Sequence, residues 1–363
     1  MTDQKFVFHV PGIPHTVTHH DYVACAYTQK VLKFCEMMTQ RGHTVIHYGH
    51  PDSQVVCTEH VDVTDDATLA QSYGDHDWRR HQFKHNINDH AYQEFNRRLA
   101  EQVRKRAQPL DFLCLPFGIG HKAAADALAD TGIIVCEPGI GYTSGSFAEW
   151  RAFESHAVRT VVEGAHNPQP WYSWVIPNYF DIEDFDYNDT KDDYILYLGR
   201  VTELKGISTC IQATAAAGAR LVIAGQGRLS DIGYAETPAH VTEVGYADRE
   251  TRRQLMSRAR ALIIATNYLE PFGGVVVEAL LSGTPIITPF FGSFEEINQQ
   301  GVTGFKCHTL REFTQAVQSS QYIQPAQCRQ RGLAYTFPVV APQFESWFAA
   351  IQEVYTGAGW TAV

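Results

Sequence analysis

The feature that most limits the possible folds is a regular alternation along the chain. Short apolar runs end in loops that contain glycine, and each loop leads into a segment with helical periodicity. In the first half, the run at 6–10 is followed by a Pro/Gly loop and a helical pattern over 22–40. In the second half, the run at 221–224 ends in Gly-Gln-Gly, and a helical pattern over 275–282 ends at Gly283. Such alternation predicts an α/β fold with parallel sheets and helices on both faces.

Two series of this kind are separated by a polar segment. A chain of 363 residues is long enough for two domains of ordinary size. The second series starts near residue 193, after an acidic, proline-containing stretch typical of a linker. We therefore expect an N-terminal domain over 1–175 and a C-terminal domain over 176–339. A last segment with aromatic residues at helical spacing, including Phe344, Trp347 and Phe348, predicts a terminal helix over about 343–355.

Charge and cysteine use narrow the functional classes. The formal net charge is −11, which argues against a dedicated nucleic-acid binder, because such a protein needs a basic surface to neutralise phosphates. The start of the chain lacks a secretory pattern, and no apolar run approaches 18 residues. The eight cysteines form no Cys-x-x-Cys pair, which indicates reduced, buried thiols. The expected location is the cytoplasm.

The residues with distinctive chemistry in the second half lie directly after predicted strands. The carboxyl ends of parallel strands line the ligand crevice of such a sheet, and glycines there let the backbone approach a ligand. In the sequence GRVTELKG, Arg200 and Lys205 lie five residues apart across a tight loop, so both can reach one diphosphate. The alternative is that both are ordinary solvated cations of a loop.

A second motif, EPFGGVVVEALL, carries two glutamates. Glu270 lies in the loop and Glu278 lies about one turn into the next helix. The glycines leave backbone N–H groups free at a helix N-terminus, which is a site for an anion. Carboxylates accept hydrogen bonds from hydroxyl groups, so the two motifs together predict a phosphate ligand with hydroxyl groups at both ends. A solvated position for Glu278 fits poorly with its apolar neighbours.

The spacing E-P-F-G-x-V-x-x-E-A-L resembles the signature of the retaining GT-B glycosyltransferases of family GT4, also called glycosyltransferase group 1. Five further segments resemble motifs of that family in the same order along residues 175–310: IPNYFDIEDF, GRVTELKGI, LVIAGQG, VTEVGYAD and GVTGF. The resemblance implies a GT-B fold, in which two Rossmann-like domains with parallel sheets face a central cleft. It also implies that the last helix, about 340–363, crosses back to complete the N-terminal domain.

Carried over position by position, the resemblance assigns roles. Arg200 and Lys205 would hold the donor diphosphate and stabilise it as the leaving group, and Glu270 would hold the transferred sugar. Glu278 would bind the ribose hydroxyls, and Tyr246 would lie beside the base. The residues implied around the donor are Gly12, Gly199, Gly225, Gly245, Tyr246, Phe272, Gly273, Gly274, Val275 and Glu278. The resemblance implies a nucleoside diphosphate sugar as co-substrate, no other cofactor and no metal.

The N-terminal domain departs from the family pattern. Family members often carry a histidine after the strand that ends here in Cys136, whereas this chain has EPGIGYT. Glu137 or Tyr142 is expected to occupy that space, and His15 and His19 of the first loop are candidates for orienting the acceptor. The histidines between 76 and 90 lack the Asp or Cys partners of a recognisable metal site, and their role stays open.

The sequence therefore predicts a retaining, metal-independent glycosyltransferase. The acceptor is a carbohydrate, a lipid-linked molecule or a small molecule. The alternatives are an epimerase-like enzyme that uses the donor alone, a non-catalytic protein that binds sugar nucleotides or glycans, and a transferase acting on modified DNA. The donor sugar, the base, membrane association and the choice between a monomer and a weak homodimer are not specified by these motifs.

Overall fold

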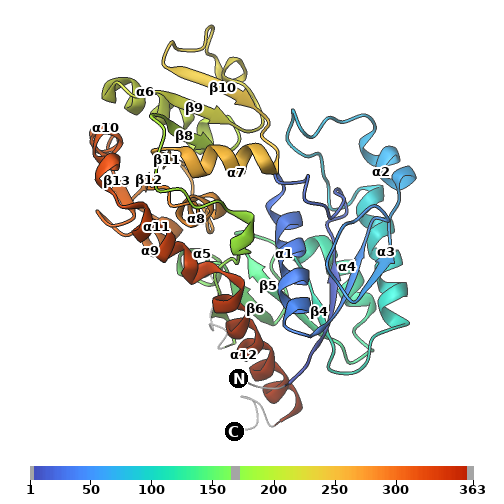
Figure 1. The fold of residues 1–363 in the computed structure, drawn as a ribbon. Helices are drawn as coiled ribbons and strands as arrows, with labels where there is room; N and C mark the ends of the chain where they lie inside the picture. The colour runs from blue at the N-terminus through green and yellow to red at the C-terminus, as the bar shows by residue number, and fades with distance from the viewer. Residues whose placement is uncertain (1–3, 165–171, 358–363) are drawn as a thin grey trace.

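The computed structural model describes residues 4–164 and 172–357 and forms two halves, each built on one sheet (Figure 1). The N-terminal half holds a seven-stranded sheet in the order β3-β2-β1-β4-β5-β6-β7, and the C-terminal half holds a six-stranded sheet in the order β10-β9-β8-β11-β12-β13. The neighbouring strands of both sheets run parallel. The prediction of an α/β fold with two parallel sheets is confirmed.

The N-terminal half alternates strands with helices. Its strands are β1 (Val7–Pro11), β2 (Thr44–Gly49), β3 (Glu59–Asp62), β4 (Phe112–Cys114), β5 (Ile134–Ile140), β6 (Trp150–Phe153) and β7 (Trp174–Val175). Its helices are α1 (Ala26–Gln40), α2 (Asp66–Tyr73), α3 (His90–Arg104), α4 (Lys122–Ala127) and α5 (His156–Glu163). The side chains of Asp65, Asp89 and Ser155 accept hydrogen bonds from the first turns of α2, α3 and α5, which sets where these helices begin.

The C-terminal half repeats the architecture. Its strands are β8 (Ile195–Leu198), β9 (Leu221–Ala224), β10 (Val241–Gly245), β11 (Ala261–Ile263), β12 (Ile286–Pro289) and β13 (Gly304–Cys307). Its helices are α6 (Ile207–Ala217), α7 (Arg249–Arg258), α8 (Gly274–Leu281), α9 (Ser293–Ile297), α10 (Leu310–Ser319) and α11 (Pro325–Gly332). All residues of β8, β9, β11 and β12 are buried, as expected for strands covered on both faces.

Both sheets reverse their strand order beside the first strand of the series. The reversal lies between β1 and β4 in one sheet and between β8 and β11 in the other. The loops that leave the carboxyl ends of neighbouring strands diverge at such a point, and ligands bind in the crevice that this opens. The topology therefore places a crevice in each half.

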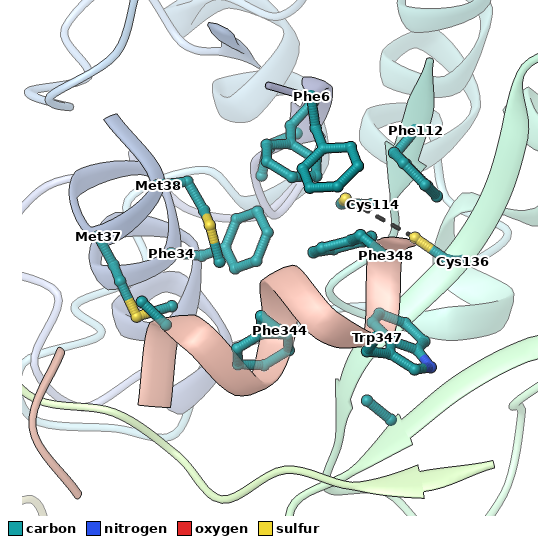
Figure 2. Packing of buried hydrophobic residues seen from close by; sticks show 14 of the residues in the cluster. Phe6, Phe34, Met37, Met38, Phe112, Cys114, Cys136, Phe344, Trp347 and Phe348 are labelled. Carbon is teal, nitrogen blue, oxygen red and sulfur yellow. Dashed lines mark hydrogen bonds between the residues drawn. The ribbon is translucent and has the colours of Figure 1, made fainter. Parts of the chain in front are cut away.

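The last helix, α12 (Phe337–Thr356), lies against the N-terminal half although it ends the chain. Phe344 and Phe348 of α12 pack against Phe34, Phe6 and Phe112, and Trp347 belongs to the same buried cluster (Figure 2). The ring centroids of Phe348 and Phe112 are 4.7 Å apart. The helix begins at Phe337, earlier than the aromatic spacing suggested, and contains Pro342.

One local prediction is corrected, and two segments without a prediction are now assigned. β5 does not stop at Cys136 but continues through Glu137 to Ile140, with a register shift after Pro138. The first half of the stretch 53–106 contains β3 and α2. Residues 74–89 contain no helix, so the histidines of this segment lie on a loop. No helix of the described residues is long and apolar enough to span a membrane.

Candidate active site

A cavity of about 650 Å³ lies between the two halves and is lined by residues of both. It is lined by the predicted residues Arg200, Lys205 and Glu270, and also by Gly199, Gly225, Tyr246, Gly273, Gly274, Val275 and Glu278. From the N-terminal half, His15 lines it together with residues of α1. The volume is within the range of small-molecule sites. The structure therefore brings the two motifs of the second half together in one cleft.

The loop between β8 and α6 carries Arg200 and Lys205 and depends on a close approach of backbones. Gly206, with φ of +70°, begins α6, and a Cβ at this position would overlap the carbonyl group of Ala265. A Cβ at Gly225 would overlap the carbonyl of Gly199 in the same way. Glycine is required at both positions, because no other residue combines this backbone with this contact. The loop is thereby held against the neighbouring strand ends.

Lys205 is paired with Glu270. Its Nζ lies 2.6 Å from Glu270 Oε2, and the hydroxyl of Tyr268 donates a hydrogen bond of 2.8 Å to the same oxygen. Burial, followed by the charge of Glu270, raises the pKa of Tyr268, so its proton stays in place as the donor. Arg200 is exposed at the cavity and forms no ion pair with a described residue. An anion that enters would meet one free guanidinium and one ammonium group held by a carboxylate.

The N-terminus of α8 points its backbone into the same space. Gly273, with φ of +74°, precedes the helix, and both Gly273 and Gly274 line the cavity. The N–H groups of a first helical turn are free to bind an anion. On the same helix, Glu278 Oε2 accepts a hydrogen bond of 2.8 Å from Arg252 Nη2, and both side chains are about four-fifths buried, with 19% and 22% exposed.

Other predicted residues lie outside the cavity lining. Gly245 and the buried Phe272 are not among the lining residues, and neither are Gly12 and His19. The N–H of Gly12 donates to the carbonyl of Tyr48. These glycine positions shape loops behind the cavity wall.

Glu137 and Tyr142 form a buried pair of their own. The Tyr142 hydroxyl donates a hydrogen bond of 2.6 Å to Glu137 Oε2, and the N–H groups of Phe147 and Ala148 donate to Oε1 at 2.8 and 2.7 Å. Glu137 has no exposed surface and does not line the cavity. Tyr142 does not line the cavity either, and the hydrogen bonds of Glu137 hold the loop 141–148 in place.

His15 does face the cavity. Its Nδ1 lies 2.8 Å from the Tyr92 hydroxyl, and its ring stacks on His85 at 4.8 Å between centroids. Burial, with smaller contributions from His85 and His121, lowers the pKa of His15 to about 3. The imidazole is therefore neutral at pH 7 and contributes hydrogen bonds, not charge.

Several lining residues were missed by the sequence patterns. Lys30 and Lys33 of α1 and Glu154 after β6 line the cavity, and Lys33 Nζ lies 4.0 Å from the ring centroid of Phe180. Burial lowers the pKa of Lys33, while Glu278 across the cleft opposes this shift. The signal in the sequence that could have found these residues was a lysine on the buried face of α1, because a buried lysine needs an ion-pair partner or a ligand.

Contacts also join the two walls directly. The Gln226 amide donates to the carbonyl groups of Trp78 and, at 3.2 Å, of His81, both in the loop 74–89. The Tyr246 hydroxyl donates to the carbonyl of Asp21 at 2.6 Å, and the Ser155 hydroxyl donates to that of Pro271 at 2.6 Å. The structure is thus a closed form of the cleft, with the loop 74–89 across one side.

The group His50, Asp52 and Asp66 comes close enough to be tested as a metal site. None of the three lines the cavity. Asp52 Oδ2 lies 3.8 Å from His50 Nδ1 and Asp66 Oδ1 lies 3.2 Å from His50 Nε2, so the two carboxylates lie at different ring nitrogens. One ligand atom from each residue lies within 4.8 Å of the others, but both aspartates are exposed, as acidic surface residues without a metal commonly are, so we do not assign a metal site here.

Comparison with solved structures supports the fold. The chain aligns with the crystal structure of AviGT4, a glycosyltransferase involved in avilamycin A biosynthesis, at a TM-score of 0.66 and 18% identity, covering 97% of this chain and 99% of the other. It aligns with a sucrose-phosphate synthase from Thermosynechococcus elongatus at a TM-score of 0.71 and 15% identity, covering 96% and 99%. A third match is Anabaena Alr3699/HepE in complex with UDP and glucose, with a TM-score of 0.68, 13% identity and 95% and 100% coverage. The predicted GT-B fold is confirmed.

Comparison by sequence is confined to a part of the chain. An uncharacterised glycosyltransferase of Methanocaldococcus jannaschii is 36% identical over 119 residues, which are 30% of each protein. A D-inositol 3-phosphate glycosyltransferase of Mycolicibacterium smegmatis is 32% identical over 125 residues, which are 32% of this chain and 29% of the relative. The matches thus span about 30% of the length of these relatives.

The family model "Glycosyl transferases group 1" matches residues 180–319. This range contains Arg200, Lys205, Glu270 and Glu278, the residues that form the C-terminal wall of the cavity. The C-terminal half of the chain is thus similar to the group 1 glycosyl transferases.

Proposed function

We propose that this protein is a retaining glycosyltransferase that moves a sugar from a nucleoside diphosphate sugar to an acceptor hydroxyl. One observation carries the proposal: Arg200, the Lys205–Glu270 pair, the N-terminus of α8 and Glu278 line a single cavity between two Rossmann-like halves. This set offers cations and N–H groups for a diphosphate and carboxylates for hydroxyl groups on both sides of it. The names of the relatives, which are transferases and synthases, support transfer over the epimerase-like alternative.

The roles follow from the pairing within the cavity. A donor diphosphate takes the Lys205 ammonium away from Glu270, and a hydroxyl of the transferred sugar then occupies the freed carboxylate oxygen. Glu278 keeps Arg252 on Oε2 and offers its other oxygen to the ribose hydroxyls. The backbone of Gly273 and Gly274 supplies N–H groups to the distal phosphate, as expected for the start of a helix.

The chemical step is the departure of the diphosphate. Negative charge grows on the leaving oxygen while the sugar becomes oxocarbenium-like, and both Arg200 and Lys205 are placed to stabilise that charge. The two side chains and the helix N-terminus fill the role that a divalent cation has in other transferases. The closed cleft keeps water from the activated sugar.

The test is turnover with a panel of UDP-, GDP-, ADP- and dTDP-sugars in the presence of mixed acceptors. We expect release of one nucleoside diphosphate that depends on acceptor, a product with the anomeric configuration of the donor by NMR, and activity that persists in EDTA. Inversion, or loss of activity in EDTA, would contradict the corresponding part of the proposal. Release without acceptor dependence would favour the epimerase-like or hydrolytic alternative.

A further inference from the structure

A second carboxylate–ammonium pair lines the same cavity on the opposite wall. Lys30 on α1 donates to Glu154 Oε1 and, at 2.6 Å, to the carbonyl of Gly139. The side chains of Lys30 and Glu154 are 9% and 5% exposed, and both line the cavity. The pair mirrors the Lys205–Glu270 pair of the C-terminal wall, but lies on the side where the donor residues are absent.

The local backbone is built around this pair. Gly139, with φ of +107°, and Gly141 belong to the Pro-Gly-Ile-Gly segment at the end of β5. A Cβ on Gly141 would lie 2.5 Å from Glu154 Oε1 and 2.6 Å from Oε2, and a Cβ on Gly139 would lie 3.2 Å from Lys30 Cδ. The two glycines leave the space that the carboxylate and the lysine stem occupy.

One oxygen of this carboxylate is unused. Oε1 of Glu154 accepts from Lys30, whereas no described residue donates a hydrogen bond to Oε2. Buried polar groups are nearly always hydrogen-bonded, and a buried ion pair contributes little net stability, so neither packing nor stability accounts for the arrangement. A carboxylate with a free oxygen at a cavity wall is a binding site for a donor group of a ligand.

The position of Glu154 relative to the proposed sugar site follows from a contact of the next residue, Ser155. The hydroxyl of Ser155 donates to the carbonyl of Pro271, the residue that follows Glu270. Glu154 therefore lies where the N-terminal wall meets the loop proposed to hold the transferred sugar, which is where an acceptor hydroxyl must arrive.

The charges of this wall bear on the acceptor. The charge of Lys30 is neutralised by Glu154, and burial keeps His15 neutral at pH 7, since its pKa is about 3. Lys33 lies on the donor side, toward Phe180 and Glu278. The aromatic rings of Tyr27 and Phe117, 4.8 Å apart, complete the surface. A phosphate bound here would lie beside the Glu154 carboxylate, while Lys33, a lysine of α1 without an ion pair to a described residue, faces Phe180.

Resting on the proposed function, we propose that Glu154, held in place by Lys30, binds a hydroxyl group of the acceptor, and that the acceptor is an uncharged polyhydroxylated molecule. The free Oε2 accepts the hydrogen bond, and the aromatic rings contact the apolar face of the molecule. The same carboxylate disfavours a phosphorylated acceptor, whose negative charge it would repel.

The experiment compares acceptor kinetics in matched variants. Lys30→Gln/Glu154→Gln removes both charges, so no buried charge is left without a partner. Arg41→Gln/Glu345→Gln removes an ion pair of the same half, with N–O distance 2.8 Å, that does not line the cavity. The acceptor probes are D-glucose, myo-inositol and glycerol against D-glucose 6-phosphate and glycerol 3-phosphate, and the readout is release of the nucleoside diphosphate.

We expect at least one uncharged probe, and neither phosphate, to accelerate release by the wild-type protein. Lys30→Gln/Glu154→Gln should raise KM for that probe about 10- to 100-fold, the loss expected for one hydrogen bond to a charged group. Its affinity for the nucleoside diphosphate should stay within about twofold of wild type, which also shows that the variant is folded. The control pair should leave KM unchanged.

The proposal is overturned if a phosphorylated probe is preferred, if no uncharged probe accelerates release, or if KM stays within about twofold in Lys30→Gln/Glu154→Gln. It is also overturned if that variant weakens binding of the sugar nucleotide while sparing the nucleoside diphosphate, since Glu154 would then contact the transferred sugar. A wild-type protein that binds no nucleoside diphosphate would refute the proposed function instead.

Discussion

At the scale of single residues, three carboxylates that line the cavity are each paired with a cation. Lys205 is bound to Glu270, Arg252 to Glu278, and Lys30 to Glu154. Each pair presents a carboxylate for hydroxyl groups, and in the first pair the ammonium group is also placed for a diphosphate. The resting site therefore carries few bare charges, which limits the desolvation that binding must overcome.

The sharpest residue-level prediction concerns Lys205. Lys205→Ala removes a cation from the leaving diphosphate and leaves Glu270 with Tyr268 alone, so turnover should fall about 10²- to 10³-fold. Steady-state kinetics with saturating donor measure this effect. Lys122→Ala, which removes an exposed lysine paired with Asp126 on α4, is the control and should stay near wild type. A Lys205→Ala enzyme within about threefold of wild type would show that this cation does not stabilise the leaving group.

At the scale of elements, two glycines at the ends of α6 form a natural comparison. Gly206 and Gly218 have nearly the same backbone, with φ of +70° and +68° and ψ of 27° for both. A Cβ on Gly218 would meet nothing within 4 Å, whereas one on Gly206 would overlap the Ala265 carbonyl. Any difference between the effects of substituting these two glycines therefore measures the close contact of Gly206 with the Ala265 carbonyl.

Gly218→Ala should lower the free energy of unfolding by about 1–2 kcal/mol, the cost of a left-handed backbone for alanine. Gly206→Ala should lower it by about 3 kcal/mol or more, because overpacking adds to that cost. It should also weaken donor binding, since Lys205 is the adjacent residue. Urea unfolding and nucleotide titration measure both effects. Equal destabilisation by the two substitutions would contradict the role given to the contact.

The last helix gives a second element-level prediction. Phe348 of α12 is fully buried against the N-terminal sheet, whereas Tyr355 of the same helix is 48% exposed. Phe348→Ala should lower the free energy of unfolding by about 3–5 kcal/mol. Tyr355→Ala should cost well under about 1 kcal/mol. Denaturant unfolding followed by tryptophan fluorescence measures both, and similar values for the two would mean that α12 does not complete the N-terminal core.

Elements differ in how well the sequence predicts them. The bounds of α6 and β9 follow from their glycine borders and apolar runs, and the C-terminal wall follows from motifs contained within single loops. The N-terminal wall could not be predicted from single motifs, because Lys30 and Glu154 are 124 residues apart in the sequence and meet only in the folded chain. The surroundings of Glu137 were not predicted for a related reason, since β5 continues past it and its carboxylate accepts a hydrogen bond from the backbone N–H of Phe147.

At the scale of the whole molecule, buried histidines couple stability to pH. Burial lowers the pKa of His121 to about 3, and neither ring nitrogen has a hydrogen-bond partner among the described residues. Its folded pKa lies below the unfolded value of about 6.5, so the unfolded chain takes up the proton first as the pH falls. The stability contributed by neutral His121 is present above pH 6.5 and is lost between pH 6.5 and 3.

His121→Leu should therefore flatten the acid side of the stability profile. The free energy of unfolding of the variant, relative to wild type, should be about 2 kcal/mol higher at pH 5 than at pH 8, because pH 5 lies about 1.5 units below the unfolded pKa. Urea unfolding at the two pH values measures the difference. His90→Leu, at an exposed position that begins α3, serves as the control. A His121→Leu profile parallel to wild type would contradict the burial of a neutral imidazole.

The central claim is that the cavity between the two halves binds a nucleoside diphosphate through the residues of its C-terminal wall. The most direct measurement is a thermal-shift titration of wild type and Glu278→Ala with UDP, GDP, ADP and dTDP. One nucleotide should stabilise the wild-type protein by about 2.7 kcal/mol at 100 times its dissociation constant, and Glu278→Ala should lose most of that gain. Stabilisation by none of them, or an equal shift in Glu278→Ala, would contradict the account.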